Sequence, residues 1–139
     1  MREIFVVGSA NVDYITTVDR LPSPGETVFG RELIKKPGGK GLNQAIAIHR
    51  AGARVVLFSA IGKDSDGELL EQFLSLENLE KVLTATDTET GKAMINVADS
   101  GENQIVVIAG ANLENNGASV DFSSKSGFLV LQCEIEPDT

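Results

Sequence analysis

The sequence is poor in cysteine, which forms the disulfides of extracellular proteins, and in the aromatic residues that stack on nucleic-acid bases. It contains one cysteine, no tryptophan and 5% aromatic residues. A single cysteine excludes an internal disulfide and a cysteine-based zinc site, and it favours the reducing cytoplasm. Twelve basic residues against 20 acidic ones give a net charge of -8, which repels phosphate backbones, and few aromatic rings are available for base stacking. We therefore expect no nucleic-acid partner.

Long hydrophobic runs are also missing. Residues 1–3 lead into a four-residue apolar run that ends at Gly8, which is too short for the core of a signal peptide. No later run approaches the length that crosses a bilayer, so we expect a soluble protein with no membrane partner. A chain of 139 residues is long enough for one modest domain.

What the sequence does contain is an alternation of strand and helix patterns. Continuous apolar runs at residues 4–7, 55–60 and 128–131 predict strands that are buried on both faces. Two stretches between them have apolar residues at helical spacing. The first helical stripe consists of Leu42, Ala45, Ile46 and His49, with Gly52 as a C-terminal cap, and the second consists of Leu69, Leu70, Phe73 and Leu74, with Ser65 and Glu68 as a capping box. This order predicts an α/β fold with a largely parallel, doubly wound sheet.

Two further segments interrupt the alternation. Residues 13–19 and 27–34 flank a turn rich in proline and glycine, and residues 93–97 and 104–108 flank a second turn. Both patterns are typical of antiparallel ribbons. We expect them to form a small accessory sheet beside the main one.

The third buried strand should be followed by a covering helix, yet only residues 132–139 remain after it. A parallel sheet with so few strands leaves an open edge and an uncovered face. We interpret the chain as part of a larger domain. The alternative is that the third strand pairs antiparallel at an edge and closes a small α+β fold.

Residues 37–45 form a glycine-rich segment at the start of the first predicted helix. Bare glycines and free N–H groups at a helix start let a ligand approach the backbone, beside Lys40 and Asn43. The segment is not a Walker A loop, which needs glycine at position 34 and Ser or Thr at 41, where Ile34 and Gly41 stand. It also fails the dinucleotide pattern, since Gln44 replaces the last glycine. The alternative is a flexible turn with a helix cap.

Polar residues follow two of the predicted strands at the ends where open α/β sheets bind ligands. Asn11 and Asp13 come after the first strand and, two residues apart in extended chain, point to the same side. Glu134 has the same position after the third strand. Carboxylates accept hydrogen bonds and amides both donate and accept, which suits neighbouring sugar hydroxyls. The residues predict one polyol pocket, although an Asx turn would explain Asn11 or Asp13 taken singly.

The motifs, taken in order, match a family. The matching segments are residues 8–13, 24–27, 38–45, 61–64, 110–112 and 132–134. They resemble the N-terminal half of the ribokinases, within the PfkB carbohydrate kinases, and they cover essentially the whole chain. Six motifs in the same order make the resemblance specific.

The resemblance implies a ribokinase-like fold and the transfer of phosphate from ATP to the 5-hydroxyl of ribose. It implies a small antiparallel lid over the sugar, formed by residues of about 13–34 and 93–108, with Ala93 and Ile95 as an apolar wall. In relatives the lid also pairs two subunits, so a homodimer is expected. The residues that the resemblance assigns to sugar binding are Asn11, Asp13, Gly39, Lys40, Gly41, Asn43 and Glu134.

The resemblance also defines what this chain lacks. The family's second half carries the nucleotide site, the catalytic base and its anion hole, together with the elements linked to Mg²⁺ and a monovalent cation. We therefore expect no catalytic residue, no metal ligand and no kinase activity in this chain alone. Residues 87–91 faintly resemble the family's catalytic motif and are interpreted as a loop; His49 and Cys133 are interpreted as a helix-end residue and a buried strand residue.

Two other functions stay open at this point. The chain could be a non-catalytic module for sugar binding or dimerisation through its ribbons. It could also belong to a kinase for another furanose sugar or a nucleoside.

Overall fold

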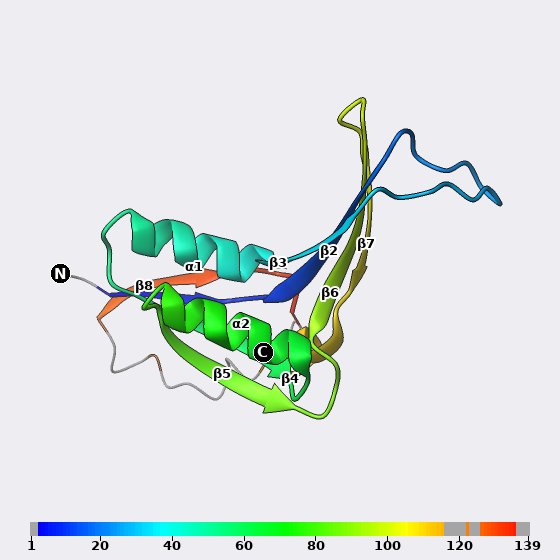
Figure 1. Ribbon diagram of the computed structural model, residues 1–139. Coiled ribbons are helices and arrows are strands. Elements are labelled where there is room, and N and C mark those ends of the chain that lie inside the picture. Colours follow the sequence, from blue (N-terminus) through cyan, green and yellow to red (C-terminus); the bar gives the residue numbers. More distant parts are fainter. Residues whose placement is uncertain (1–2, 116–121, 123–125, 136–139) are drawn as a thin grey trace.

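The computed structural model describes residues 3–115, 122 and 126–135, which form two four-stranded sheets and two α-helices (Figure 1). The elements, in chain order, are β1 (Glu3–Val7), β2 (Asn11–Val18), β3 (Leu33–Gly38), α1 (Lys40–Arg50), β4 (Val55–Gly62), α2 (Ser65–Leu76), β5 (Glu80–Thr86), β6 (Gly91–Ala98), β7 (Asn103–Ile108), the 3-10 helix η1 (Gly110–Glu114) and β8 (Gly127–Leu131).

The main sheet has the strand order β5-β4-β1-β8, and all of its pairs are parallel. Every residue of β4 is buried, as its continuous apolar sequence requires of a central strand. The prediction that residues 128–131 are buried on both faces is wrong, because β8 is an edge strand with four of its five residues exposed. The parallel α/β sheet is confirmed. Because β8 pairs parallel with β1, the alternative of an antiparallel edge strand closing an α+β fold is wrong. The edge strand β5 has no counterpart among the predicted strands.

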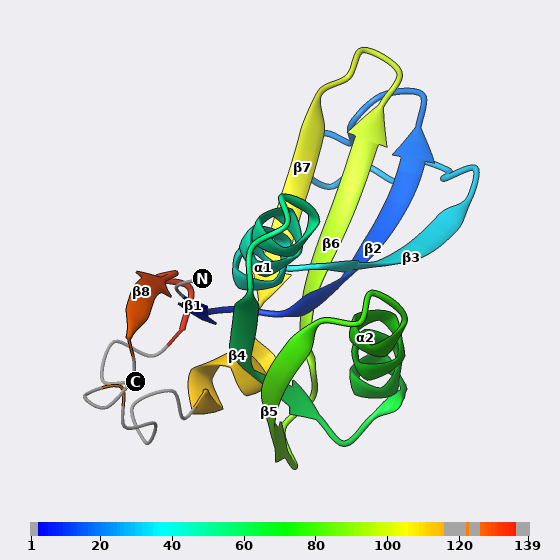
Figure 2. The same ribbon diagram turned by 90° about the vertical axis from the view of Figure 1, so that its left-hand side faces the viewer.

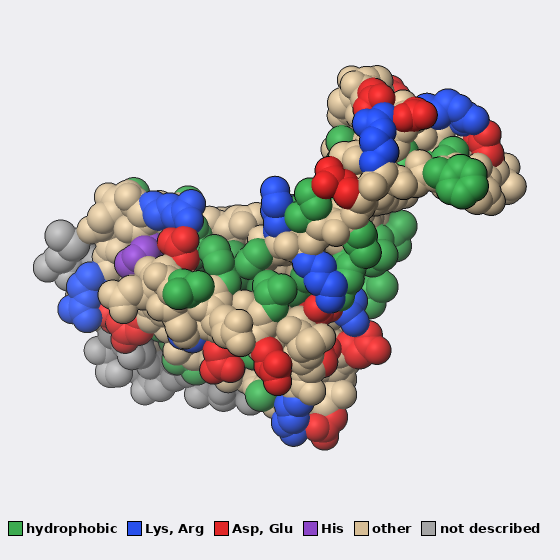
Figure 3. Space-filling model, viewed as in Figure 1, with side chains coloured by type: hydrophobic (Ala, Val, Ile, Leu, Met, Phe, Trp, Pro, Cys, Tyr) green, Lys and Arg blue, Asp and Glu red, His purple; other side chains and the backbone are tan. Residues whose placement is uncertain are grey.

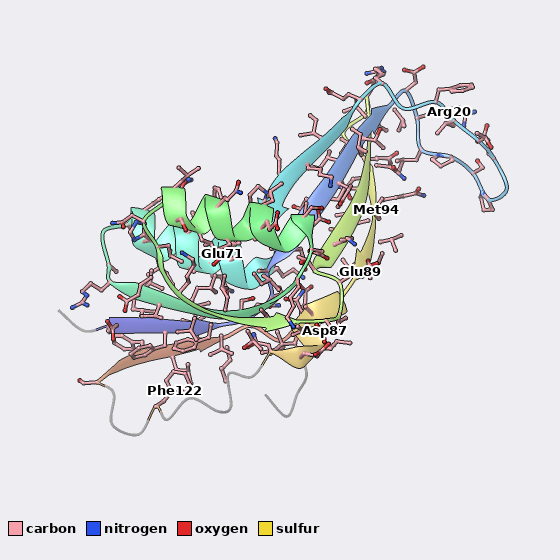
Figure 4. The ribbon with its side chains drawn as sticks, turned by 60° about the horizontal axis from the view of Figure 1, so that its bottom comes forward. Arg20, Glu71, Asp87, Glu89, Met94 and Phe122 are labelled. Carbon is pink, nitrogen blue, oxygen red and sulfur yellow. The ribbon has the colours of Figure 1, made fainter. Side chains whose placement is uncertain are left out.

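The two helices cover one face of the main sheet. Val6 and Leu57 of the sheet pack in one core with Leu42 of α1 and with Leu70 and Leu74 of α2. The opposite face carries a second cluster around three aromatic rings, Phe5, Phe58 and Phe122, whose centroids lie 5.5 to 6.3 Å apart. Figure 4 shows Phe122 on the side of the sheet away from both helices. No helix in the described part of the chain is long and apolar enough to cross a membrane.

The second sheet has the order β3-β2-β6-β7 and projects away from the main sheet, so we call it the projecting sheet (Figure 2). Both predicted antiparallel ribbons are present, and β2 and β6 join them in parallel. The predicted second strand of the first ribbon, residues 27–34, is displaced: β3 begins at Leu33 and its pairing continues to Gly38, opposite Asn11. The ladder therefore continues to the start of α1.

Asp66 of α2 ties the base of the projecting sheet to the helices. The Tyr14 hydroxyl donates to Asp66 Oδ2 at 2.5 Å, and Lys35 Nζ donates to Oδ1 at 3.0 Å. Lys35 also lies 4.5 Å from the centroid of the Tyr14 ring, and Lys92 Nζ lies 4.0 Å from the same carboxylate. Residues from β2, β3 and β6 thus converge on one buried acid.

The N-cap of α2 lies one residue earlier than the sequence predicts. Its N-cap is Asp64, whose Oδ1 accepts from the Gly67 N–H at 2.8 Å, so the predicted capping box of Ser65 and Glu68 is wrong. Asp64 also accepts from the backbone N–H and the hydroxyl of Thr90. Partial burial opposes ionisation, but these hydrogen bonds outweigh it and lower the pKa of Asp64. Asp64 is the N-cap instead of Ser65 because its one carboxylate hydrogen-bonds both to the helix start and to Thr90, just before β6.

Candidate functional site

The glycine-rich segment places the start of α1 directly on the turn between β1 and β2. Gly39, the N-cap residue, has φ of 93°, a conformation that side chains disfavour. A Cβ at Gly39 would lie 2.8 Å from the Ala10 Cα and the Asn11 nitrogen, and one at Gly41 would lie 2.6 Å from the Gly8 carbonyl carbon. The Leu42 N–H donates to Ser9 O at 3.0 Å across the same contact. A side chain at position 39 or 41 would prevent this close contact between the two backbone segments.

Asp13 lies against the same segment. A Cβ at Gly38 would be 2.5 Å from Asp13 Cγ, so the carboxylate occupies the space that the glycine leaves open. In the projecting sheet, Asp13 is opposite Lys36 on one side and Ala93 on the other. Asp13 is partly buried, and this desolvation raises the pKa of its carboxyl group.

Asn11 begins β2 and is 5% exposed. Its Oδ1 accepts from Nδ2 of Asn112 in η1 at 2.7 Å. Asn112 is itself buried and donates to the carbonyl of Ala109 at 2.9 Å. The first residue of β2 is therefore held by a side chain 101 positions away in the sequence.

A cleft of about 390 Å³ opens beside Asn11. Four of its lining residues are polar, namely Ser9, Asn11, Asn112 and Glu134, and the others are Val107, Ala109, Leu113, Cys133 and Ile135. The Ser9 hydroxyl is buried and has no hydrogen-bond partner among the described residues. A polar floor beneath an apolar rim is suited to a small, hydroxylated ligand.

Glu134 reaches this cleft because Gln132 fixes the chain after β8. The Gln132 N–H donates to Val7 O at 2.9 Å, and Gln132 Oε1 accepts from the Ser9 N–H at 3.0 Å. Lys40 of α1 forms an ion pair with Glu134. The end of β8 is thus connected both to the turn after β1 and to the start of α1.

The structure brings most of the predicted site residues together. Asn11 and Glu134 line one cleft, Lys40 is paired with Glu134, and Asp13, Gly39 and Gly41 lie at the adjoining contact between α1 and β2, as the preceding paragraphs describe. Asn43 is in the first turn of α1 with an exposed side chain, and no contact of that side chain with the cleft is present among the described residues.

Three residues around the cleft had no predicted site role: Ser9, Asn112 and Gln132. All three stand within segments that carry the family resemblance, which was the available signal. The prediction that Cys133 is a buried strand residue is wrong. It lies past the end of β8, is exposed, and lines the cleft.

The comparisons with known proteins agree with this geometry. Residues 1–138 match the model of the pfkB family of carbohydrate kinases. The chain belongs to this family. It is 37% identical to the ribokinase of Bacillus subtilis over 145 residues, which cover 100% of this chain and 49% of that enzyme.

Solved structures give the same assignment. Ribokinase from Thermotoga maritima superposes with a TM-score of 0.90 and 34% identity, covering 100% of this chain and 48% of that one. Ribokinase from Arabidopsis thaliana, complexed with ribose and ATP, gives a TM-score of 0.81 and 28% identity over 97% of this chain and 46% of that one. The ribokinase-like fold is confirmed, and the chain corresponds to the N-terminal part of these enzymes, about half their length.

The first prediction concerns Gly39. We expect Gly39→Ala to lower the free energy of unfolding by more than ~2 kcal/mol, because it adds both φ strain and a clash with the backbone of residues 9–11. Gly52→Ala is the matched control, since Gly52 has φ of 85° but no heavy atom within 4 Å of an added Cβ. Urea denaturation of the two variants measures the difference. Equal losses would show that the close approach contributes nothing.

The second prediction concerns the pH dependence that Asp13 creates. Because its pKa is raised in the folded state, the native protein holds this proton more tightly than the unfolded chain does. The free energy of unfolding therefore falls as the pH rises from the ordinary carboxyl pKa through the raised pKa of Asp13, and it stays lower at pH 7.

We accordingly expect Asp13→Asn to be more stable than the parent at pH 7, with the advantage vanishing in acid. Denaturation at pH 7 and at pH 3 measures it. Asp87→Asn is the control of opposite sign, because a hydrogen bond from Lys63 lowers the pKa of that exposed carboxyl group. An Asp13→Asn variant that is less stable at pH 7 would contradict the assignment.

Proposed function

We propose that this chain is the sugar-binding half of an ATP-dependent ribokinase, which converts D-ribose to ribose 5-phosphate when the second half is present. The family match and the ribokinase relatives support the reaction type, and the A. thaliana neighbour was solved with ribose and ATP. The chain itself spans about half the length of those enzymes. We expect the 139-residue chain alone to be inactive.

The observation that carries the proposal is the wall formed by Asp13, Asn11 and the start of α1. Asp13 and Asn11 alternate along β2 and so face the same side of the strand. An ionised Asp13 accepts hydrogen bonds from sugar hydroxyls, and the raised pKa reflects the partial burial that a small ligand would complete. Gly39 and Gly41 allow the start of α1 to pack directly on residues 8–11, which brings the helix start beside Asn11 and Asp13.

Lys40, Asn43 and Glu134 complete the proposed sugar contacts. The ion pair between Lys40 and Glu134 orients both side chains beside the cleft. Asn43, in the exposed first turn of α1, is proposed to contact the sugar from the helix side.

Magnesium and the monovalent cation are assigned to the second half of the enzyme. The described residues contain no group of three or more His, Cys, Asp and Glu side chains that could hold a metal ion. We propose no cation-binding role for this chain. Its own part is to bind and orient the sugar and to exclude water, since water at the site would favour hydrolysis of ATP over transfer.

The projecting sheet is proposed to act as the lid. Its register places Ile34, Ile15, Ile95 and Ile105 in one row across all four strands. This row is on the same face as Asp13 and Ala93, two residue pairs further along the strands from the main sheet. The expected apolar wall of Ala93 and Ile95 is thus part of a continuous surface.

The lid is also proposed to pair two subunits. The row includes Ile105, which is 52% exposed, and exposed hydrophobic side chains gather over the β7 side of the projecting sheet in Figure 3. An apolar surface of this kind is costly to leave in water. We place the homodimer in the cytoplasm, where ATP is available and the lone Cys133 stays reduced.

The third prediction is sugar binding by the chain. We expect titration calorimetry to detect D-ribose binding and Asp13→Ala to weaken it at least 10-fold, because the variant removes the main hydroxyl acceptor. Asp87→Ala, which removes an exposed carboxylate paired with Lys63, is expected to leave the affinity unchanged. Phosphate transfer from labelled ATP, measured on the chain joined to its C-terminal half, tests the reaction itself.

The outcomes separate the candidate functions. Binding of another furanose or a nucleoside in preference to ribose would keep the kinase and change its substrate. No binding of any of these sugars, with dimers intact, would favour an interaction module and overturn the proposal.

The fourth prediction concerns the dimer. We expect Ile105→Asp to convert dimers to monomers in sedimentation experiments, because it puts a charge into the apolar row. Val106→Asp is the control: Val106 is 63% exposed and adjacent, but it faces the opposite side of the same strand. Equal effects of the two variants would contradict pairing through this face.

A further inference from the structure

The buried contact between Asn112 and Asn11 determines more than the position of a side chain. Asn112 is 1% exposed, and its side chain makes four hydrogen bonds. Its partners are Ala10, through both the N–H and the carbonyl, the Ala109 carbonyl, and the side chain of Asn11. The side chain of Asn112 therefore hydrogen-bonds to the backbone of two separate segments beside the cleft, at Ala10 and at Ala109.

The backbone fixes the orientation of the Asn112 amide. A backbone N–H can only donate, so the atom that lies 2.9 Å from the Ala10 nitrogen must be the Asn112 oxygen. The Asn112 nitrogen then faces the two carbonyls, which can only accept, of Ala10 at 3.2 Å and Ala109 at 2.9 Å. If the Asn112 amide were flipped, its nitrogen would face the Ala10 N–H, so two donors would meet. Its oxygen would then face the carbonyl oxygens of Ala10 and Ala109.

The orientation of Asn11 follows from that of Asn112. Because a donor of Asn112 faces it at 2.7 Å, the inner atom of the Asn11 amide must be the oxygen. The remaining atom is Nδ2, and no described residue accepts a hydrogen bond from it. Asn11 lines the cleft, so it presents a hydrogen-bond donor there.

A glycine makes the contact possible. Gly91 is opposite Asn11 in the pairing of β2 and β6. A Cβ at Gly91 would overlap both Asn112 Nδ2 and Asn11 Oδ1 and would lie 2.8 Å from the Ala109 carbonyl oxygen. The two amides therefore meet in space that a side chain at position 91 would fill.

We propose that Asn112 is a positioning residue that sets the hydrogen-bond polarity of the sugar site by holding Asn11 as a donor. Asp13, two residues along the same face, is an acceptor when ionised. The pair fits two hydroxyls of one sugar, of which one accepts from Asn11 Nδ2 and the other donates to Asp13. This inference rests on the proposed sugar-binding function, and it adds a residue that acts on the sugar through Asn11.

The polarity is set before the sugar arrives. A flipped Asn11 would place its amide hydrogens against those of Asn112, and both groups are buried, so an unmade hydrogen bond there is costly. A site whose donors are already oriented loses less freedom on binding. Discrimination between a hydroxyl and its deoxy analogue should then depend on Asn112.

The variant Asn112→Asp tests this dependence. It keeps an oxygen for the Ala10 N–H but replaces the nitrogen that faces Asn11 by a second oxygen. The Asn11 amide is then expected to turn its nitrogen inward and to present its oxygen to the cleft. The control is Asn115→Asp: Asn115 is 5% exposed and donates to the carbonyls of Gly8 and Phe58, but it does not contact Asn11.

The measurement is calorimetric affinity for D-ribose and for its 2-deoxy and 3-deoxy analogues. Each deoxy analogue that lacks a contacted hydroxyl is expected to bind the unaltered chain more weakly than ribose does. The analogue whose affinity no longer falls below that of ribose in Asn11→Ala identifies the hydroxyl that Asn11 contacts. In Asn112→Asp we expect the preference for ribose over that analogue to fall at least 10-fold. In Asn115→Asp both affinities are expected to change by the same factor, which leaves the preference unchanged. A preference retained in Asn112→Asp, or lost equally in Asn115→Asp, would overturn the proposal.

A measurement on the unaltered chain keeps the proposal testable if Asn112→Asp does not fold. Nitrogen-15 NMR follows the hydrogen exchange of each side-chain amide. We expect the Asn112 amide hydrogens to exchange slowly with or without sugar, and those of Asn11 to exchange faster until ribose is added. Asn11 hydrogens that are as protected as those of Asn112 without sugar would overturn the proposal. If ribose does not bind at all, the sugar-binding function fails, while the exchange contrast in the free chain still decides the orientation of Asn11.

Discussion

The close approach of the α1 start to the turn after β1 is the constraint on which the site depends. Two backbone segments meet there with no side chain between them, because Gly39 and Gly41 lack Cβ atoms. This contact sets where β2 begins, and β2 carries Asn11 and Asp13 before it continues into the projecting sheet. One packing contact therefore positions the helix, Asn11 and Asp13, and the start of the projecting sheet together (Figure 1).

The shared strand couples the site to the projecting sheet. Tyr14, the residue after Asp13, donates to the buried Asp66 of α2, and Lys35 of β3 donates to the same carboxylate. The first residues of β2 are thus fixed to the helices, whereas the sheet beyond them extends from the body toward the loop that carries Arg20 in Figure 4. Such a division would keep the proposed hydroxyl-binding residues rigid and leave the proposed lid less restrained.

Sequence reasoning succeeded where apolar residues are continuous and failed where a partner distant in sequence decides the structure. The strands β1, β4 and β8 were predictable because each is a run of apolar residues, although the edge strand β8 is largely exposed and not buried on both faces as predicted. The half-exposed edge strand β5 contains no such run. The start of β3 was misplaced because its register is set by pairing with β2 as far as Gly38, not by its own composition. Asp64 was overlooked as the N-cap since its second partner is Thr90, 26 residues away.

The same reason explains which part of the site was predictable. Asn11, Asp13 and Glu134 stand at strand ends, where topology alone brings polar side chains to one edge of a sheet. The hydrogen-bonding direction of Asn11 is a different kind of property, because it depends on which atom of Asn112 meets the Ala10 N–H. In the proposed sugar site, residue types thus define which contacts are available, and a buried neighbour such as Asn112 decides which of those contacts are used. For a sugar, whose hydroxyls differ in position and direction but not in chemistry, that decision is the basis of selectivity.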